Sequence, residues 1–160
     1  MAGRRTRAIE PEEVLSDLLG LDTKLRLERY WGERSIFYNP GGEAPLGIIW
    51  ASIKDHDGEN DSSSRLSRDG VYRFAFQLGR DEYERRFGAR PGRPPRGGVV
   101  DIPAYDPTRL NELMPHPVYA WMGWVQVLAP TPGRFQSLEP LLSESLDTVR
   151  RKWARRRPRG

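Results

Sequence analysis

Residues 71–78 read Val71-Tyr72-Arg73-Phe74-Ala75-Phe76-Gln77-Leu78, and this stretch decides the fold. Aromatic and aliphatic side chains at the even positions alternate with Arg73 and Gln77. Such alternation is typical of a β-strand whose two faces meet different surroundings. A strand of this kind needs neighbouring strands and a layer of helices to bury its aromatic face. The stretch therefore predicts a sheet with helices packed against it.

Other strands are expected on both sides of this one, at residues 25–31, 35–38, 46–53 and 124–128. Gly32-Glu33 and the run Asn39-Pro40-Gly41-Gly42 provide turns after the first two of these strands. Residues 46–53 are apolar on both faces, which favours a central strand. The polar segment 54–65 is expected to interrupt the sheet as an exposed loop.

Apolar residues at helical spacing predict helices before, within and after the sheet. The first begins at Pro11 and ends at Gly20, and a short one is stopped by Gly88. Another is expected to begin at Asp106-Pro107, with Leu110, Leu113 and Met114 as its apolar edge. A long last helix runs from Leu138 to Trp153, with Ser137 as its cap.

Short turns between successive strands favour antiparallel pairing. The predicted fold is therefore α+β, a mainly antiparallel sheet of four to five strands with helices packed on one face and a long C-terminal helix. The 160 residues suit a single domain. Cysteine is absent, which excludes disulfides, thiol catalysis and cysteine-ligated metals. No run approaches the roughly 20 apolar residues of a membrane span, and no signal peptide is apparent, so we expect a cytoplasmic location.

The basic charge of the chain is confined to its two ends. Of the 26 Lys and Arg residues, 10 lie in residues 1–7 and 150–160, while all 22 acidic residues lie between. The interval 8–149 thus holds 16 basic and 22 acidic residues, a net charge of −6. We expect a basic disordered end over residues 1–8 and one domain over 9–149. The basic end 150–160 is expected to continue the last helix before fraying.

One candidate ligand site centres on Pro115-His116-Pro117. The two prolines restrict the backbone around His116 and so fix the direction of its ring. An imidazole held in this way suits recognition or proton transfer near neutral pH. Aromatic residues follow closely and offer the walls of a pocket, namely Tyr119, Trp121 and Trp124. The alternative is structural, with His116 bonded to a neighbouring loop and the aromatic residues filling the core.

An enzymatic alternative makes His116 a general acid or base. Its orienting carboxylate would be Asp69, Asp101 or Asp106, within hydrogen-bond reach of the ring. No nucleophile elbow, phosphate loop or dinucleotide fingerprint occurs. We therefore expect no cofactor, and a buried ring bonded only to backbone would argue against any site at His116.

Two other features admit a functional interpretation beside a structural one. Asp55, Asp57, Glu59 and Asp61 alternate along the polar loop, as oxygen ligands of calcium do, but the glycine and glutamate of a calcium-binding loop are missing. A solvated loop is favoured over a weak cation site, so no metal is expected.

Residues 150–159 place seven positive charges at a helix end, which would allow weak nucleic-acid binding. The net negative charge of residues 8–149 would oppose such binding.

Two segments resemble an uncharacterised bacterial family, the domain of unknown function 6194, which is frequent among actinobacteria. They are Leu113-Met114-Pro115-His116-Pro117-Val118-Tyr119-Ala120 with the Gly123-Trp124-Val125 that follows, and residues 64–74. Phe37-Tyr38 is a further shared feature, and Asp69 stands where a proline is expected in the turn before Gly70. The resemblance covers residues 11–149. It implies a compact α+β domain and draws attention to His116 and Arg73.

Together these observations favour a non-enzymatic accessory domain that binds a small ligand or a protein. Its ligand-binding residues would be His116, Tyr119, Trp121, Trp124 and Arg73. Arg73 interrupts an otherwise apolar strand, where it would face solvent or an anionic ligand.

Overall fold

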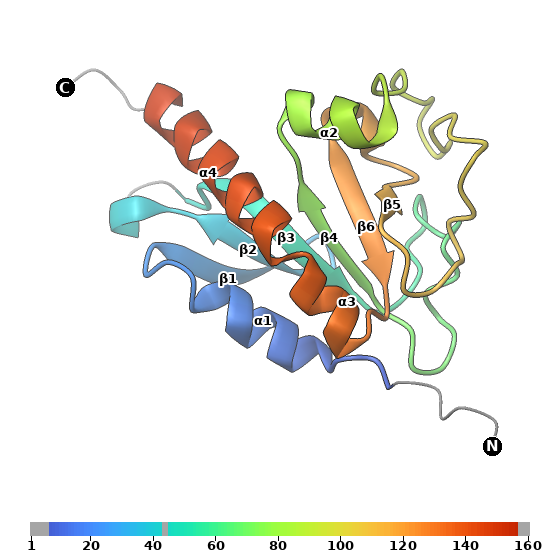
Figure 1. The fold of residues 1–160 in the computed structure, drawn as a ribbon, viewed down its shortest axis with the longest axis horizontal. Helices are drawn as coiled ribbons and strands as arrows, with labels where there is room; N and C mark the ends of the chain where they lie inside the picture. Colours follow the sequence, from blue (N-terminus) through green and yellow to red (C-terminus); the bar gives the residue numbers. More distant parts are fainter. Residues whose placement is uncertain (1–6, 43–44, 157–160) are drawn as a thin grey trace.

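The computed structural model describes residues 7–42 and 45–156. Six antiparallel strands form one open sheet in the order β1-β2-β3-β4-β6-β5 (Figure 1). The strands are β1 (Leu25–Tyr30), β2 (Glu33–Tyr38), β3 (Ile48–Lys54), β4 (Arg73–Gln77), β5 (Met114–Pro115) and β6 (Trp124–Leu128). The antiparallel α+β prediction is confirmed, but with six strands in place of four to five. The sixth, β5, has only two residues, too few to show an alternating pattern.

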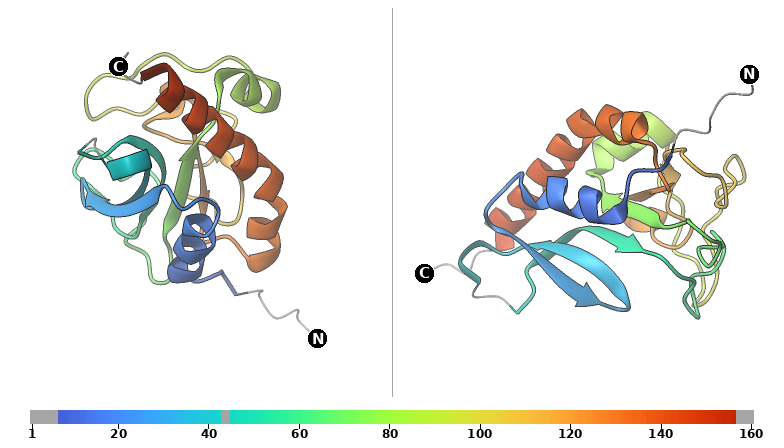
Figure 2. Two further views of the ribbon diagram at one scale, coloured as in Figure 1. Left: turned by 90° about the vertical axis from the view of Figure 1, so that its left-hand side faces the viewer. Right: turned by 90° about the horizontal axis from the view of Figure 1, so that it is seen from below.

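Helices cover one face of this sheet (Figures 1 and 2). The helices are α1 (Pro11–Leu19), α2 (Arg80–Phe87), α3 (Pro132–Ser137) and α4 (Glu139–Arg156). α4 crosses β2, β3 and β4, while α1 packs beside β1. The main core lies between α1, α4 and the strand residues on that face, including Ile36, Ile53, Phe74, Phe76 and Val125.

β4 shows why the opposite face has a different character. Phe74 pairs with Ile53 and Val127 and lies on the helix side, whereas Arg73 pairs with Lys54 and Leu128 and lies on the other side. Both faces of β4 are buried, because the segments 55–72 and 88–113 cover the second face. We call this second face the loop-covered face. The predicted exposed loop over 54–65 is therefore wrong in part: Lys54, Asp61 and Ser64 are buried, because they serve as partners in the Arg73 network.

Two helix expectations are also corrected. No helix begins at Asp106-Pro107, because the Asp106 carboxylate accepts hydrogen bonds from the backbone N–H and hydroxyl of Thr108 and closes a local turn. Ser137 does not cap α4. It ends α3 instead, and its hydroxyl donates to the carbonyl of Arg134.

The expected boundaries at the two chain ends fall partly outside the described residues. Positions 1–6 and 157–160 lie there. Within the described part, α4 continues to Arg156. No helix of the described chain is long and apolar enough to cross a membrane.

Candidate functional site

A cavity of about 270 Å³ lies on the loop-covered face, beside the β1–β2 hairpin and the segment that follows β5. We call it the His116 cavity. Its walls are mostly aromatic or aliphatic, with a carboxyl group, two serine hydroxyls and an imidazole among them. The lining residues are Tyr30, Trp31, Glu33, Ser35, Ile49, Ser52, His116, Tyr119, Met122 and Trp124.

The backbone around His116 fixes the orientation of its ring. The N–H of His116 donates to the carbonyl of Trp124, 3.0 Å away, so the residue continues the pairing of β5 with β6. The ring nitrogen Nδ1 accepts hydrogen bonds from the backbone N–H groups of Val118 (3.0 Å) and Tyr119 (3.1 Å). Because Nδ1 accepts two hydrogen bonds, the proton of the neutral imidazole belongs on Nε2.

Electrostatics keep the ring neutral. Burial lowers the pKa of His116 well below its usual value, and the positive charges of Arg73 and Lys54 lower it further, against a smaller opposing effect of Asp61. Among the hydrogen bonds of the described chain, none engages Nε2. The His116 ring is thus buried and bonded only to backbone, the arrangement expected of a structural histidine, and this counts against the predicted site at His116 itself. The residue nevertheless lies among those that line the cavity.

Aromatic rings form the rest of the wall. The Tyr119 ring lies 5.0 Å from the His116 ring, centroid to centroid. Tyr30 and Trp31 come from the tip of the β1–β2 hairpin and meet edge to face. Trp31 is 81% exposed. Side chains of this kind supply large, flat contact surfaces for a ligand.

The hairpin tip holds Trp31 in an uncommon conformation. Trp31 and Gly32 form a two-residue loop, one position earlier than the predicted Gly32-Glu33 turn, and their φ values are +55° and +72°. This pattern is that of a type I′ turn, which favours asparagine, aspartate or glycine at both positions. A bulky residue there is strained, and such strain is concentrated at functional sites.

Glu33 places a carboxyl group in the cavity wall. Its Oε1 accepts a hydrogen bond of 3.0 Å from the hydroxyl of Ser52. Burial raises the pKa of Glu33, and the nearby charge of Lys54 only partly offsets this. The cavity thus pairs the imidazole donor with a poorly solvated acceptor.

Arg73 lies outside the cavity lining. Its guanidinium is fully buried and donates to both carboxylate oxygens of Asp61, at 2.5 and 2.9 Å. It also donates to Ser64 Oγ (3.2 Å) and Gln126 Oε1 (2.7 Å). Lys54 shares the same carboxylate. With four donor contacts made within the protein, Arg73 holds the loop 55–72 on the sheet.

The structure brings three of the five predicted ligand residues together, namely His116, Tyr119 and Trp124. Trp121 lies in an adjoining groove of about 420 Å³, under the guanidinium of Arg93. Sequence reasoning missed Tyr30, Trp31 and Glu33. The one available signal was a tryptophan directly before a turn glycine.

The other predicted partners lie elsewhere. Asp69, Asp101 and Asp106 are exposed and do not line the His116 cavity. In the polar loop, Asp57 accepts from the backbone N–H of Leu66, and Asp55 contacts His56. Within residues 7–42 and 45–156, no group of three or more potential metal-ligating side chains comes together.

Fold and site define an α+β domain with one antiparallel sheet, whose loop-covered face holds an aromatic cavity. The sequence model of DUF6194, a family of unknown function, matches residues 9–158, and the chain belongs to this family. The family region thus includes most of the basic C-terminal end, which the resemblance had excluded. Comparisons with curated proteins and with solved structures find no match.

Proposed function

We propose that the protein is a binding domain for a small, planar, uncharged molecule, held in the His116 cavity. The observation that carries the proposal is the cavity itself, in which aromatic side chains and the carboxyl group of Glu33 lie together on the loop-covered face. A ligand acceptor, such as a nitrogen of a heterocycle, would bond to Nε2 of His116, for which the described residues supply no hydrogen bond.

The shape and charge of the cavity support this class of ligand. Four aromatic side chains offer faces on which a flat ring stacks, namely Tyr30, Trp31, Tyr119 and Trp124. The carboxyl of Glu33 accepts a hydrogen bond from a ligand donor. The volume of about 270 Å³ suits a molecule of one or two fused rings.

A thermal-shift screen with uncharged nitrogen heterocycles tests the proposal. We expect at least one compound to raise the Tm of the wild type by about 2 °C or more, the size of shift that ligand linkage produces well above Kd. Trp31→Asn and Tyr119→Ala should weaken the response about tenfold in ligand concentration. Leu21→Asn, which changes an exposed apolar residue outside the cavity, is the matched control. An equal response in all four proteins would overturn the proposal.

A protein partner is a second candidate, favoured by the exposed apolar rim of the cavity. Tyr30, Trp31, Tyr119 and Met122 are all exposed there. Contiguous apolar surface of this kind is typical of interaction sites. In this case a partner side chain would fill the cavity, and a binding partner captured from the native cells would be released by Trp31→Asn but retained by Leu21→Asn.

The family resemblance implies a bacterial cytoplasmic setting, which we include in the proposal and which cell fractionation tests.

A further inference from the structure

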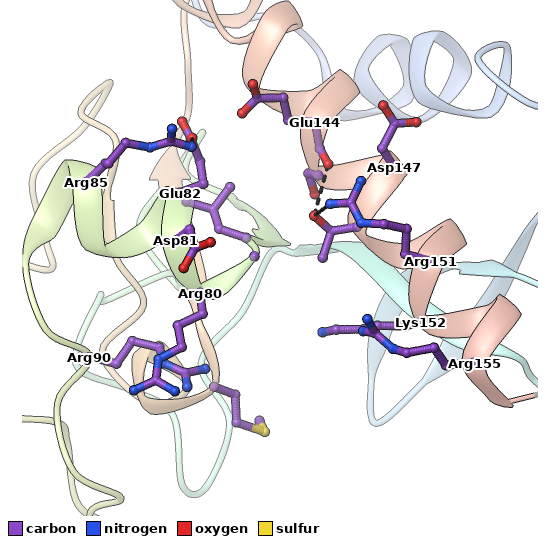
Figure 3. Close-up of a pocket in the computed structure, with 15 residues that line it drawn as sticks. Arg80, Asp81, Glu82, Arg85, Arg90, Glu144, Asp147, Arg151, Lys152 and Arg155 are labelled. Carbon is purple, nitrogen blue, oxygen red and sulfur yellow. Dashed lines mark hydrogen bonds and ion pairs between the residues drawn. The ribbon is translucent and has the colours of Figure 1, made fainter.

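A second hollow, of about 650 Å³, lies between α2 and α4 (Figure 3). We call it the α2–α4 cleft. Its lining includes Leu78, Gly79 and Ser145 together with charged side chains from both helices. The two hollows share a single lining residue, Met122. A ligand in one hollow therefore contacts a largely different set of residues from a ligand in the other.

Charges of both signs line this cleft: Arg85 and Arg151 lie beside the carboxylates at one end, and Asp81 lies between Glu82 and Arg80 (Figure 3). Glu144 and Asp147 lie toward one end of α4, and Glu82 faces them from α2 (Figure 3). Lys152 and Arg155 lie farther along α4 and extend toward the side on which Arg80 and Arg90 lie. We call this second set the basic end.

The two ends differ in how their charges are balanced. At the acidic end, Glu82 pairs with Arg85 and Arg86, and Asp147 pairs with Arg150. At the basic end, Arg80 pairs with Glu84. Arg90, Lys152 and Arg155 form no ion pair with any carboxylate of the described residues.

Two of these unpaired cations, Lys152 and Arg90, lie against neutral groups. The ammonium of Lys152 donates to the amide oxygen of Gln77 at the end of β4. The side chain of Arg90 lies against the backbone at Gly123, where an added Cβ would be 3.9 Å from its Nη1. Positioning without neutralisation costs electrostatic free energy, because like charges are kept close together.

The pKa of Lys152 reflects both its burial and the neighbouring positive charges. Burial lowers its pKa, and the positive charges of Arg155 and Arg90 lower it further. A lysine with a lowered pKa destabilises the fold while it is charged. A bound anion would offset the repulsion among these cations.

From the cavity and its unpaired cations we infer that the basic end of the α2–α4 cleft binds a compact, multivalent anion of the phosphate class. A phosphate or diphosphate group offers several acceptor oxygens to the guanidinium groups of Arg90 and Arg155 and to the ammonium of Lys152. This site lies beyond the function proposed for the His116 cavity.

Compactness follows from the surroundings of the basic end. A nucleic-acid strand that continued along the cleft would meet Glu82, Glu144 and Asp147. A small anion occupies the basic end without contacting these carboxylates.

Calorimetric titration of the full chain with inorganic pyrophosphate, at constant ionic strength, tests the inference. We expect one pyrophosphate per chain, with binding at least tenfold weaker in the double variant Arg90→Gln/Lys152→Gln. The matched control is Arg29→Gln/Arg109→Gln, which removes two exposed positive charges elsewhere and should bind within twofold of the wild type. Equal affinity in both double variants, or no binding by the wild type at millimolar pyrophosphate, would overturn the inference.

Two further measurements complete the test. Thermal unfolding without ligand should show the Arg90→Gln/Lys152→Gln variant folded and at least as stable as the wild type, because it relieves repulsion. A single-stranded oligodeoxynucleotide should bind at least tenfold more weakly than pyrophosphate. The reverse order of affinity would overturn the compact-anion inference in favour of nucleic acid.

Discussion

Asp61 balances two buried cations on the loop-covered face, the guanidinium of Arg73 and the ammonium of Lys54. The three groups come from β3, β4 and the segment between them, so they attach that segment to the sheet. Removing one member of a buried ion cluster leaves the remaining charge without compensation, which is costly.

We predict that Asp61→Asn lowers the free energy of unfolding by about 3–5 kcal/mol at pH 7, as measured by urea denaturation. Asp69→Asn, an exposed position that loses the same charge, should change it by less than about 0.5 kcal/mol. Equal stability of the two variants would show that the cluster contributes nothing.

Asp61 also makes the stability of the protein depend on pH at the acidic end of the range. Burial raises the pKa of Asp61, but the hydrogen bond and charge of Arg73 outweigh burial and leave the pKa well below its usual range. Its contribution to stability is therefore present above the unfolded pKa, near 4, and is lost as the pH falls through the folded value. Wild-type stability should fall steeply below about pH 4, and this part of the decline should be absent from Asp61→Asn.

Trp31 is the residue at which stability and binding are expected to oppose each other. Asparagine tolerates a positive φ, so Trp31→Asn should raise the free energy of unfolding by about 0.5–1 kcal/mol in urea denaturation. Trp31→Ala is the control, because it removes the same ring but keeps the strain. A gain of the same size in both variants would place the effect in the exposed ring and not in the backbone.

At the scale of elements, α4 is joined to the sheet by a buried hydroxyl. Ser145 Oγ accepts a hydrogen bond of 2.8 Å from Trp50 Nε1 on β3 and donates to the carbonyl of Gln77 on β4. All of these contacts lie within the core side of the sheet, where water does not replace them.

Ser145→Ala should therefore cost about 1–3 kcal/mol of unfolding free energy, because a buried N–H and a carbonyl lose their partner. Ser143→Ala, on the exposed side of the same helix, is the matched control. Chemical denaturation followed by Trp fluorescence measures both. A Ser145→Ala protein as stable as the Ser143→Ala protein would mean that packing alone holds α4.

The elements that the sequence predicts well are those with a long periodic pattern. α1 occupies the predicted residues, and β4, β6 and α4 follow their apolar spacing closely. The failures occur where one residue type serves two purposes. Aspartate begins helices and also closes turns, so Asp106 misled the prediction, and the two residues of β5 carry no period.

The site was predictable only where its residues are close in sequence. His116, Tyr119 and Trp124 fall within nine positions, and their aromatic character was visible. The pairing of β1 with β2, and the position of that hairpin beside the β5 segment, bring Tyr30, Trp31 and Glu33 to the cavity. No local pattern reports such an arrangement. Nor does one show that Asp61 neutralises Arg73.

At the scale of the whole molecule, two residues of the last helical turns, Arg150 and Trp153, pack against the rest of the described chain. Arg150 donates to Asp22 at 2.8 and 3.1 Å, and Trp153 meets the Tyr38 ring edge to face. The family match also extends through residue 158.

Deleting residues 150–160 should accordingly lower the free energy of unfolding by about 2–4 kcal/mol, because an ion pair, an aromatic contact and the last helical turns are lost. Arg151→Ala, an exposed residue in the same segment, should have little effect and serves as the control. The measurement is urea denaturation of the purified chains. Unchanged stability after the deletion would show that the segment is dispensable for folding.

The two outer strands of the sheet govern how the protein behaves at high concentration. β1 is exposed over five of its six residues and carries Arg26, Glu28 and Arg29, while β5 ends after two residues at a proline. Charge on one border and a missing N–H on the other both discourage a second chain from extending the sheet. The open sheet is thereby protected against edge-to-edge aggregation, and no further element is needed to cover its borders.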